Sequence, residues 1–296
     1  MCVNNVRRTL GIDRIHYEGY TGKDINIAIV DTGISNIHRD LAGAVIGFKD
    51  FVNERISPYD DNGHGTHVGG IIAGNGMASN EMFKGIAPDA KIISVKTLNS
   101  KGKGKAEIFM KGIEWIKKNR KKYNIRIVNI SVGTIAGDNS RRDRIENREL
   151  IECVDELWDL GVIVVAAAGN NRPEAGSVTI PGASRKVITV GVADYHNIIK
   201  YSVWRTYNSI SKPEIVAPGT RITSCNNYQS YYTSKSGTSM ATPIVSGVIA
   251  LALSKNQKIT NEEMKKYIKK TATEYSISDK SKIWGMINPR NLIDLV

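Results

Sequence analysis

The chain has 296 residues, of which 41% are hydrophobic and 24% are charged, and its 41 basic and 29 acidic residues give a formal net charge of +12. This length allows one large domain or two small ones. No run of about 18 apolar residues occurs, so the sequence predicts no transmembrane helix.

The amino-terminal segment and the cysteines bear on the compartment. Residues 1–15 contain no apolar core of signal-peptide length. The cysteines, Cys2, Cys153 and Cys225, are widely separated and match no zinc-binding spacing, and their odd number argues against a disulfide framework. We therefore expect a cytoplasmic protein, with a secreted mature form that has lost its leader as the alternative.

Basic residues cluster at 117–122, 141–144 and 265–270. The first and last clusters lie in helical patterns, where a solvated face is the usual explanation. The sequence shows no aromatic interleaving and no recognised binding motif, so we expect no nucleic-acid partner and no membrane partner. The positive charge favours an acidic partner or substrate.

Strand-like and helix-like segments alternate along the chain. The expected strands are INIAIV (25–30), AVIGF (44–48), KIISV (91–95), RIVNI (126–130), GVIVVAAA (161–168) and VITVGV (187–192). The expected helices cover about 64–74, 105–121, 143–160, 239–254 and 261–271. The strands are continuous apolar runs, which is typical of a parallel sheet buried on both faces. The alternation predicts one doubly wound α/β domain spanning residues 1–296.

Small polar groups follow three of these strands. Asp31, Ser131 and Asn170 each lie at or near a strand end, close to a glycine. In open α/β sheets, ligands bind outside the carboxyl ends of the strands. We therefore expect the functional site at this edge of the sheet.

The segment GTSMATP (237–243) places Ser239 at the start of a long apolar helix. Unpaired amides and the positive end of the helix dipole favour developing negative charge there. Taken alone, a serine in this place is more simply an N-cap. Pro243 falls near the end of the first turn, where a missing amide hydrogen costs little.

Two further residues favour a chemical role for Ser239. A serine nucleophile needs a base, usually a histidine, which a carboxylate orients. Asp31, His64 and Ser239 follow one another in an order that occurs in catalytic triads. The side-chain amide of Asn170 and the backbone amide of Ser239 would bind an oxyanion. These residues predict acyl-transfer chemistry.

Two of the five histidines, His64 and His67, lie three residues apart in DDNGHGTHVGG (60–70). Helical zinc pairs usually lie four residues apart with a glutamate between them, and this pair does not match that pattern. We expect His67 to be a packed, hydrogen-bonded residue and not a metal ligand.

Five segments resemble the signature segments of the subtilisin family of serine peptidases: IAIVDTGI, DNGHGTHVGGIIAG, VVAAAGNN, KPEIVAPG and SGTSMATPIVSGVIAL. They occur in that family's order and spacing, and the similarity runs from about residue 10 to residue 293. The resemblance implies a single α/β domain with a mainly parallel sheet of about seven strands flanked by helices. It also implies a serine endopeptidase. Asp31 matches the acid that orients the imidazole, and His64 matches the general base. Ser239 matches the nucleophile, and Asn170 matches the oxyanion donor.

Other functions remain open at this point. One is a catalytically silent pseudoprotease that binds peptides without cutting them. Another is an esterase of a different α/β class, although its nucleophile normally lies in G-x-S-x-G after a strand. Within the peptidase interpretation, the role is either general protein turnover or the processing of a precursor peptide.

The resemblance also implies a substrate cleft in which a peptide binds as an added β-strand. One edge is matched by Ser131, Val132 and Gly133, the other by Gly102, Lys103 and Gly104, and the wall of the primary pocket by Ala168, Gly169 and Thr179. Threonine at position 179 would make that pocket shorter. Lys235 flanks the leaving-group side. Together with Lys105 and the arginines at 141, 142 and 144, these lysines predict substrates that are acidic beside the scissile bond.

The chain departs from the family in two places. The loop GNGMASNEMFKG (74–85) differs in length from the calcium-binding loop of secreted subtilisins, and Asp40 matches one calcium ligand without evident partners. We therefore predict no metal and no cofactor. The sequence has no counterpart of the family's amino-terminal inhibitory segment, so we expect either folding without one or its earlier removal.

Overall fold

The computed structural model describes residues 3–134, 141–170, 178–193, 205–207, 210–274 and 283–296. Its centre is an eight-stranded sheet with the strand order β12-β9-β6-β5-β4-β1-β3-β2, in which every neighbouring pair is parallel. The strands are β1 (Asn26–Asp31), β2 (Val45–Asp50), β3 (Lys91–Lys96), β4 (Ile125–Ile130), β5 (Ile163–Ala167), β6 (Ile188–Val192), β9 (Ile215–Ala217) and β12 (Gly285–Met286).

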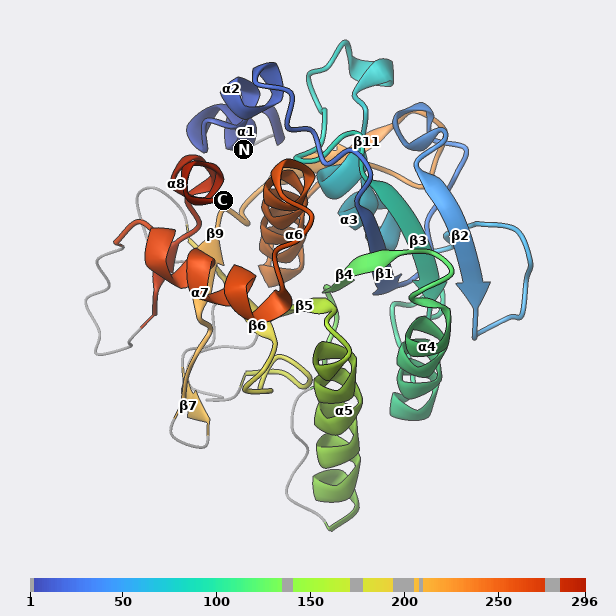
Figure 1. The fold of residues 1–296 in the computed structure, drawn as a ribbon. Coiled ribbons are helices and arrows are strands. Elements are labelled where there is room, and N and C mark those ends of the chain that lie inside the picture. Colours follow the sequence, from blue (N-terminus) through green and yellow to red (C-terminus); the bar gives the residue numbers. More distant parts are fainter. Residues whose placement is uncertain (1–2, 135–140, 171–177, 194–204, 208–209, 275–282) are drawn as a thin grey trace.

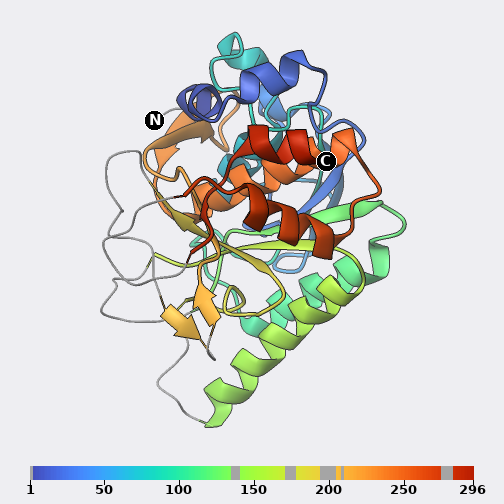
Figure 2. The ribbon, with the colours of Figure 1, turned by 60° about the vertical axis from the view of Figure 1, so that its left-hand side comes forward.

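Helices cover both faces of this sheet (Figures 1 and 2). On one face, α3 (His64–Ala73) packs against α6 (Thr238–Lys255), and α6 also contacts β4, β5, β6 and β9. On the other face, α4 (Ala106–Asn119) packs against β1 and against α5 (Arg141–Asp159), which contacts β5. The arrangement is therefore the single α/β domain with a parallel sheet that the sequence predicts.

The periodic segments form where the sequence predicts them. The six expected strands are β1 to β6, and the five expected helices are α3, α4, α5, α6 and α7 (Asn261–Thr271). The sheet has eight strands, because β9 and β12 extend the six expected strands at one edge, and the resemblance implied about seven. These strands have three and two residues, which is too short for a hydrophobic period to be recognised.

Further elements were not expected from the sequence. They are the helices α1 (Val3–Thr9), α2 (Ile12–Tyr17) and α8 (Pro289–Leu295), the short 3-10 helices η1 (Arg39–Leu41) and η2 (Met77–Ser79), and the hairpins β7 (Arg205–Tyr207) with β8 (Ile210–Lys212) and β10 (Ile222–Cys225) with β11 (Tyr232–Lys235). The terminal helices lie close together, since Arg290 of α8 forms an ion pair with Glu18 at the end of α2 at 2.7 Å.

Helix α6 is the apolar centre of the molecule. Its 18 residues are long and apolar enough to cross a membrane by composition alone, which differs from the expectation from the sequence. In the fold, 83% of this window is buried against the sheet and α3. Its hydrophobicity is therefore explained by packing within the core.

Candidate active site

Asp31 and His64 form a direct ion-pair contact. Asp31 is the last residue of β1 and is 1% exposed, and His64 is the first residue of α3. The imidazole Nδ1 lies 2.8 Å from Oδ1 and 2.9 Å from Oδ2 of Asp31. Because Nδ1 faces a carboxylate, it carries the hydrogen, and this leaves Nε2 as the proton acceptor.

A glycine allows α3 to approach the end of β1 this closely. A Cβ atom at Gly65 would lie 2.1 Å from the carbonyl oxygen of Gly33 and 3.2 Å from Cβ of Asp31. Any larger residue would therefore push the first turn of α3, which carries His64, away from β1. The glycine after the histidine is thus explained by geometry.

Several charges act on the His64 imidazole. Burial alone would lower its pKa, but the charge and the hydrogen bond of Asp31 outweigh burial, so the pKa is raised from 6.5. Lys235 opposes this increase and Asp60 adds to it. The Asp31 carboxylate therefore stabilises the imidazolium that forms when His64 accepts a proton.

His67 has the structural role that the sequence predicts. Its side chain is fully buried, and Nε2 donates to the carbonyl oxygens of Ile222 at 3.0 Å and Thr233 at 3.1 Å. Burial lowers its pKa to about 3, so the ring is neutral. His67 thus joins α3 to the β10–β11 hairpin.

Ser239 is the second residue of α6. The N-cap of this helix is Gly237, so the interpretation of Ser239 as an N-cap is wrong. Its hydroxyl donates to the carbonyl oxygen of Ser131 at 2.7 Å. Pro243 is the sixth helical residue and so lies beyond the first turn, later than expected.

The side chain of Asn170 is oriented by the residue before Ser239. Its Oδ1 accepts from the backbone amide of Thr238 at 2.8 Å and from the Thr238 hydroxyl at 3.1 Å. With the oxygen held in this way, the Nδ2 hydrogens are the donors left for a ligand.

One cavity of about 370 Å³ brings most of the candidate residues together. It is lined by Thr32, Asn62, His64, Leu98, Gly102, Ser131, Val132, Gly133, Ala167, Gly169, Asn170, Thr179, Thr238 and Ser239. Asp31 does not line the cavity but contacts His64, which does. Ala168 is fully buried, and Ala167 lines the cavity in its place, which differs from the expected pocket wall.

Thr179 fills space inside this cavity. A Cβ atom at Gly133 would lie 2.7 Å from Thr179 Oγ1, and one at Gly169 would lie 2.5 Å from Thr179 Cγ2. The threonine side chain therefore lies against both glycines. The hydroxyl also donates to the carbonyl oxygen of Ala167 at 3.3 Å.

A second cavity of about 850 Å³ adjoins the first and lies between the two expected cleft edges. Gly102, Lys103 and Gly104 line one side of it, and Val132 to Thr134 line another. Lys105, Asp143 and Glu146 also line it, so both signs of charge are present. The side chains of the arginines at 141 and 142 lie outside the described residues.

Asp40 is the residue that matches a calcium ligand in the family resemblance. It belongs to a buried cluster with His38 and Cys225, whose potential ligand atoms lie within 4.8 Å of one another. Asp40 already accepts from the amide of Ala78 at 2.7 Å and from the hydroxyl of Tyr232 at 2.8 Å. His38 Nδ1 accepts from the amide of Asp40 at 3.1 Å. The cluster is thus a hydrogen-bonded polar network that anchors the loop 74–85.

The comparisons with known proteins agree with this geometry. Residues 22–286 match the model of the subtilase family. The chain belongs to that family. It is 37% identical to "Serine protease AprX" of Bacillus subtilis, with 92% of this chain and 67% of that protein covered, and 34% identical to "Subtilisin DY" of Bacillus licheniformis, with 88% of each covered. A solved "cold adapted subtilisin-like serine proteinase" has a TM-score of 0.73 at 29% identity over 90% of this chain and 88% of that one.

The subtilase chain is therefore a serine endopeptidase whose substrate is a peptide or a protein. Sequence reasoning did not single out Thr32, Asn62 or Thr238. Each lies one or two residues from a candidate residue and makes a hydrogen bond to a candidate residue that only the fold reveals.

Proposed function

We propose that this subtilase cleaves peptide bonds through a triad of Asp31, His64 and Ser239. His64 Nε2 takes the proton of the Ser239 hydroxyl as the serine attacks the scissile carbonyl. An acyl-enzyme forms, and the protonated imidazole gives its proton to the leaving amine. Water then attacks the acyl-enzyme, with His64 again as the base. Asp31 holds the imidazole and stabilises its charged form.

The observation that carries this proposal is the contact between Asp31 and His64, together with the cavity that His64 and Ser239 both line. Since Ser239 Oγ donates to Ser131 in the resting structure, the hydroxyl must turn toward His64 before it attacks. We expect the substrate to pair as a β-strand with the Ser131 edge. A backbone amide of the substrate would then compete with the Ser239 hydroxyl for the carbonyl oxygen of Ser131.

We assign Asn170 to the oxyanion hole. Its Oδ1 is anchored on Thr238, so Nδ2 remains to donate to the negative charge that develops on the carbonyl oxygen. The backbone amide of Ser239, in the first turn of α6, is the second donor. The Ser239 amide is fixed by α6, and the Asn170 side chain is oriented by its two contacts with Thr238, which preorganises the site.

The test is the variant Ser239→Ala, with Ser254→Ala at the far end of the same helix as the control. Removing the Ser239 hydroxyl should lower kcat on the order of a millionfold, a magnitude that was measured in subtilisin itself. Ser254 Oγ donates to Leu251 O at 2.7 Å and accepts from the amide of Gly22 at 3.3 Å, and neither partner belongs to the candidate site, so its variant should retain full activity. Cleavage by Ser239→Ala at the wild-type rate would refute the triad.

The pseudoprotease alternative is tested separately. A serine-reactive phosphonate should label the wild-type protein with one group per chain and should not label Ser239→Ala. The two relatives named above are a serine protease and a subtilisin, which favours catalysis over silent binding.

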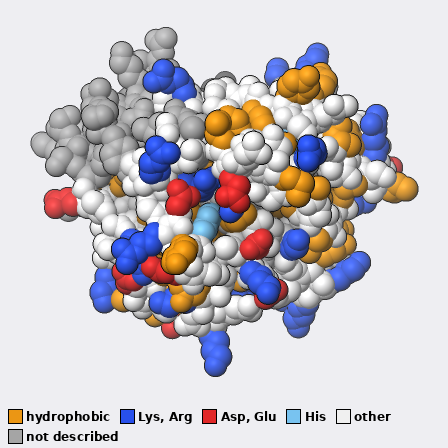
Figure 3. All heavy atoms as spheres, turned by 90° about the horizontal axis from the view of Figure 1, so that it is seen from above, with side chains coloured by type: hydrophobic (Ala, Val, Ile, Leu, Met, Phe, Trp, Pro, Cys, Tyr) orange, Lys and Arg blue, Asp and Glu red, His pale blue; other side chains and the backbone are white. Residues whose placement is uncertain are grey.

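We further propose that acidic residues beside the scissile bond favour cleavage. Lys235 is close enough to lower the pKa of His64, and Lys103 lies on the opposite cleft edge. The face with α1 and α2, which Figure 3 shows, carries Lys and Arg side chains interspersed with Asp and Glu side chains, so the basic residues are not confined to the cleft. Asp143 and Glu146 line the larger cavity and oppose an acidic substrate residue in it. The expected preference therefore applies only to substrate residues close to Ser239.

Matched peptides with acidic or neutral flanks test the charge proposal. The acidic peptide should have the higher kcat/KM at low salt, and the advantage should shrink at high salt because ions screen the attraction. Equal values of kcat/KM at both salt concentrations would refute it.

Three wider assignments are also proposals. We propose that the peptidase domain comprises residues 1–296, since the pair of Arg290 and Glu18 joins the two terminal regions outside the family match. We propose a cytoplasmic location, since Cys153 and Cys225 are both free thiols, as is usual in a reducing compartment. Processing of a precursor peptide is preferred over general turnover, and a peptide-library cleavage profile tests this because a processing enzyme cleaves few sequences.

A further inference from the structure

Lys96 is a buried lysine beside the candidate site. It is the last residue of β3 and pairs in register with Asp31 on β1. Its side chain is 0% exposed. A buried ammonium costs several kcal/mol unless it is paired and fully hydrogen-bonded, so its partners need an explanation.

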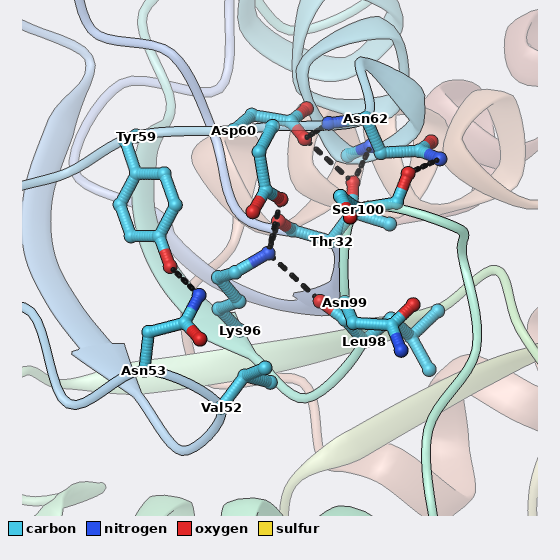
Figure 4. A network of polar contacts seen from close by, with 12 residues as sticks. Thr32, Val52, Asn53, Tyr59, Asp60, Asn62, Lys96, Leu98, Asn99 and Ser100 are labelled. Carbon is cyan, nitrogen blue, oxygen red and sulfur yellow. Dashed lines mark hydrogen bonds and ion pairs between the residues drawn. The ribbon is translucent and has the colours of Figure 1, made fainter.

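The three donors of this ammonium are all used. Nζ donates to the carbonyl oxygen of Thr32 at 2.6 Å, to that of Leu98 at 2.8 Å and to Oδ1 of Asp61 at 2.7 Å. Figure 4 shows the Lys96 side chain pointing toward the backbone of Thr32 and Leu98. The ring of Tyr59 lies 5.1 Å from Nζ, which adds a cation–π contact.

The three partners come from three different parts of the site. Thr32 directly follows Asp31, and Asp61 lies three residues before His64. Leu98 begins the segment that leads to Gly102, and both line the smaller cavity. One cation therefore joins the strand that carries the acid, the turn that carries the base and an edge of the substrate cleft.

A second carboxylate fixes the same turn from its other side. Asp60 Oδ1 accepts from the Thr32 hydroxyl at 2.9 Å, and Oδ2 accepts from the amide of Thr66 at 2.9 Å and from its hydroxyl at 2.7 Å. The side chain of Asn62 donates to the carbonyl oxygen of Ser100 at 2.9 Å (Figure 4). The turn before His64 is thus held to α3 by Asp60 and to β3 by Lys96.

We propose that Lys96 is a positioning residue for peptide hydrolysis, which fixes the Asp31–His64 pair relative to the cleft edge through Thr32, Asp61 and Leu98. The inference rests on the triad proposed above. Lys96 touches no substrate, and its effect passes through the backbone. A lysine that only stabilised the fold would change the free energy of unfolding but leave the kinetics of the folded enzyme unchanged.

The experiment compares Lys96→Met with Lys91→Met. Both lysines lie on β3, but Lys91 is at the other end of the strand, where Nζ donates only to Gly43 O at 2.9 Å. Rates are measured per active site, titrated with a serine-reactive phosphonate, at a temperature where each variant is folded. Lys96→Met should lower kcat roughly tenfold to a hundredfold and raise KM, because small misplacements of reacting groups are that costly. Lys91→Met should retain the wild-type kcat and KM.

A milder variant keeps the proposal testable if Lys96→Met does not fold. Asp61 is 32% exposed, and Asp61→Ala removes only one of the three partners of Lys96. It should lower kcat/KM severalfold with a folded, titratable site. Wild-type kinetics in folded Lys96→Met, or in Asp61→Ala where Lys96→Met does not fold, would overturn the proposal. This result would leave the triad intact, since Ser239→Ala tests that independently.

Discussion

In the proposed triad, the resting positions of three side chains decide how the reaction begins. Asp31 has already fixed the tautomer of His64, so the base needs no rearrangement. Ser239 does, because its hydroxyl is hydrogen-bonded to the Ser131 carbonyl. The proposed mechanism therefore requires Oγ to rotate away from this carbonyl oxygen and toward the imidazole. The resting enzyme is thus preorganised in its acid and base and adjustable in its nucleophile.

The raised pKa of His64 predicts the pH dependence of activity. The protonated imidazole cannot accept a proton, so kcat/KM should rise with pH through a single ionisation that lies above 6.5. Lys235 lowers the pKa of His64, so Lys235→Met should move this ionisation to higher pH. A pH–rate profile of each protein measures both effects. A flat profile between pH 5 and 9, or a shift to lower pH in the variant, would contradict a histidine base.

Thr179 predicts the size of the residue accepted at the cleaved position. Its side chain lies against Gly133 and Gly169, so Thr179→Gly should open the cavity. We expect kcat/KM for an aromatic residue to rise about tenfold relative to alanine, the scale of discrimination in apolar pockets. For Thr179→Ser, which keeps the hydroxyl near Ala167, this ratio of kcat/KM values should lie between those of the wild type and Thr179→Gly. Unchanged preferences in Thr179→Gly would place the primary pocket elsewhere.

At the scale of elements, long segments were predictable and short ones were not. β1 and α3 carry clear apolar runs, and the strand-end rule located Asp31 and Asn170. β12 has two residues and no sequence signal, so the sheet is one strand larger than expected. The Lys96 network was missed because its partners come from three segments that meet only in the fold.

Helix α1, which has no strong hydrophobic period, is fixed by the contacts of one side chain. Arg7 is 5% exposed, and its guanidinium donates to the carbonyl oxygens of Lys84 at 2.6 Å and Glu81 at 3.2 Å. Its Nε donates to Asp13 at 2.7 Å. One side chain therefore joins α1, α2 and the loop 74–85, whose departure from the family pattern the sequence had indicated.

Arg7→Met should destabilise this part of the molecule. The change leaves two part-buried carbonyl groups and Asp13 without their donor, and hydrogen bonds to charged groups contribute about 1.5–3 kcal/mol to the free energy of unfolding. Arg8 is its exposed neighbour on the same helix, so Arg8→Met is the control and should change stability little. Urea unfolding measures both. Equal effects of the two substitutions would show that the Arg7 contacts do not stabilise the fold.

At the scale of the whole molecule, buried histidines link stability to pH. Burial lowers the pKa of His16 and His38, and it lowers that of His67 to about 3. In the unfolded chain, each of these residues takes up a proton near pH 6.5. Between these values the unfolded state binds more protons than the native state. The free energy of unfolding therefore falls as the pH drops below 6.5.

The lowered pKa of His67 predicts a loss of stability at acid pH, which the substitution His67→Gln should reduce. Below pH 6.5, a fully shifted group costs about 1.4 kcal/mol for each pH unit. His64 acts in the opposite direction, because its raised pKa stabilises the fold below 6.5 and this contribution is lost as the pH rises through the raised value. Urea midpoints between pH 7.5 and 5 should therefore decrease for the wild type. They should decrease less in His67→Gln, whose amide still donates to the carbonyl oxygens of Ile222 and Thr233 but does not titrate. An equally steep loss in the variant would show that His67 is not the group responsible.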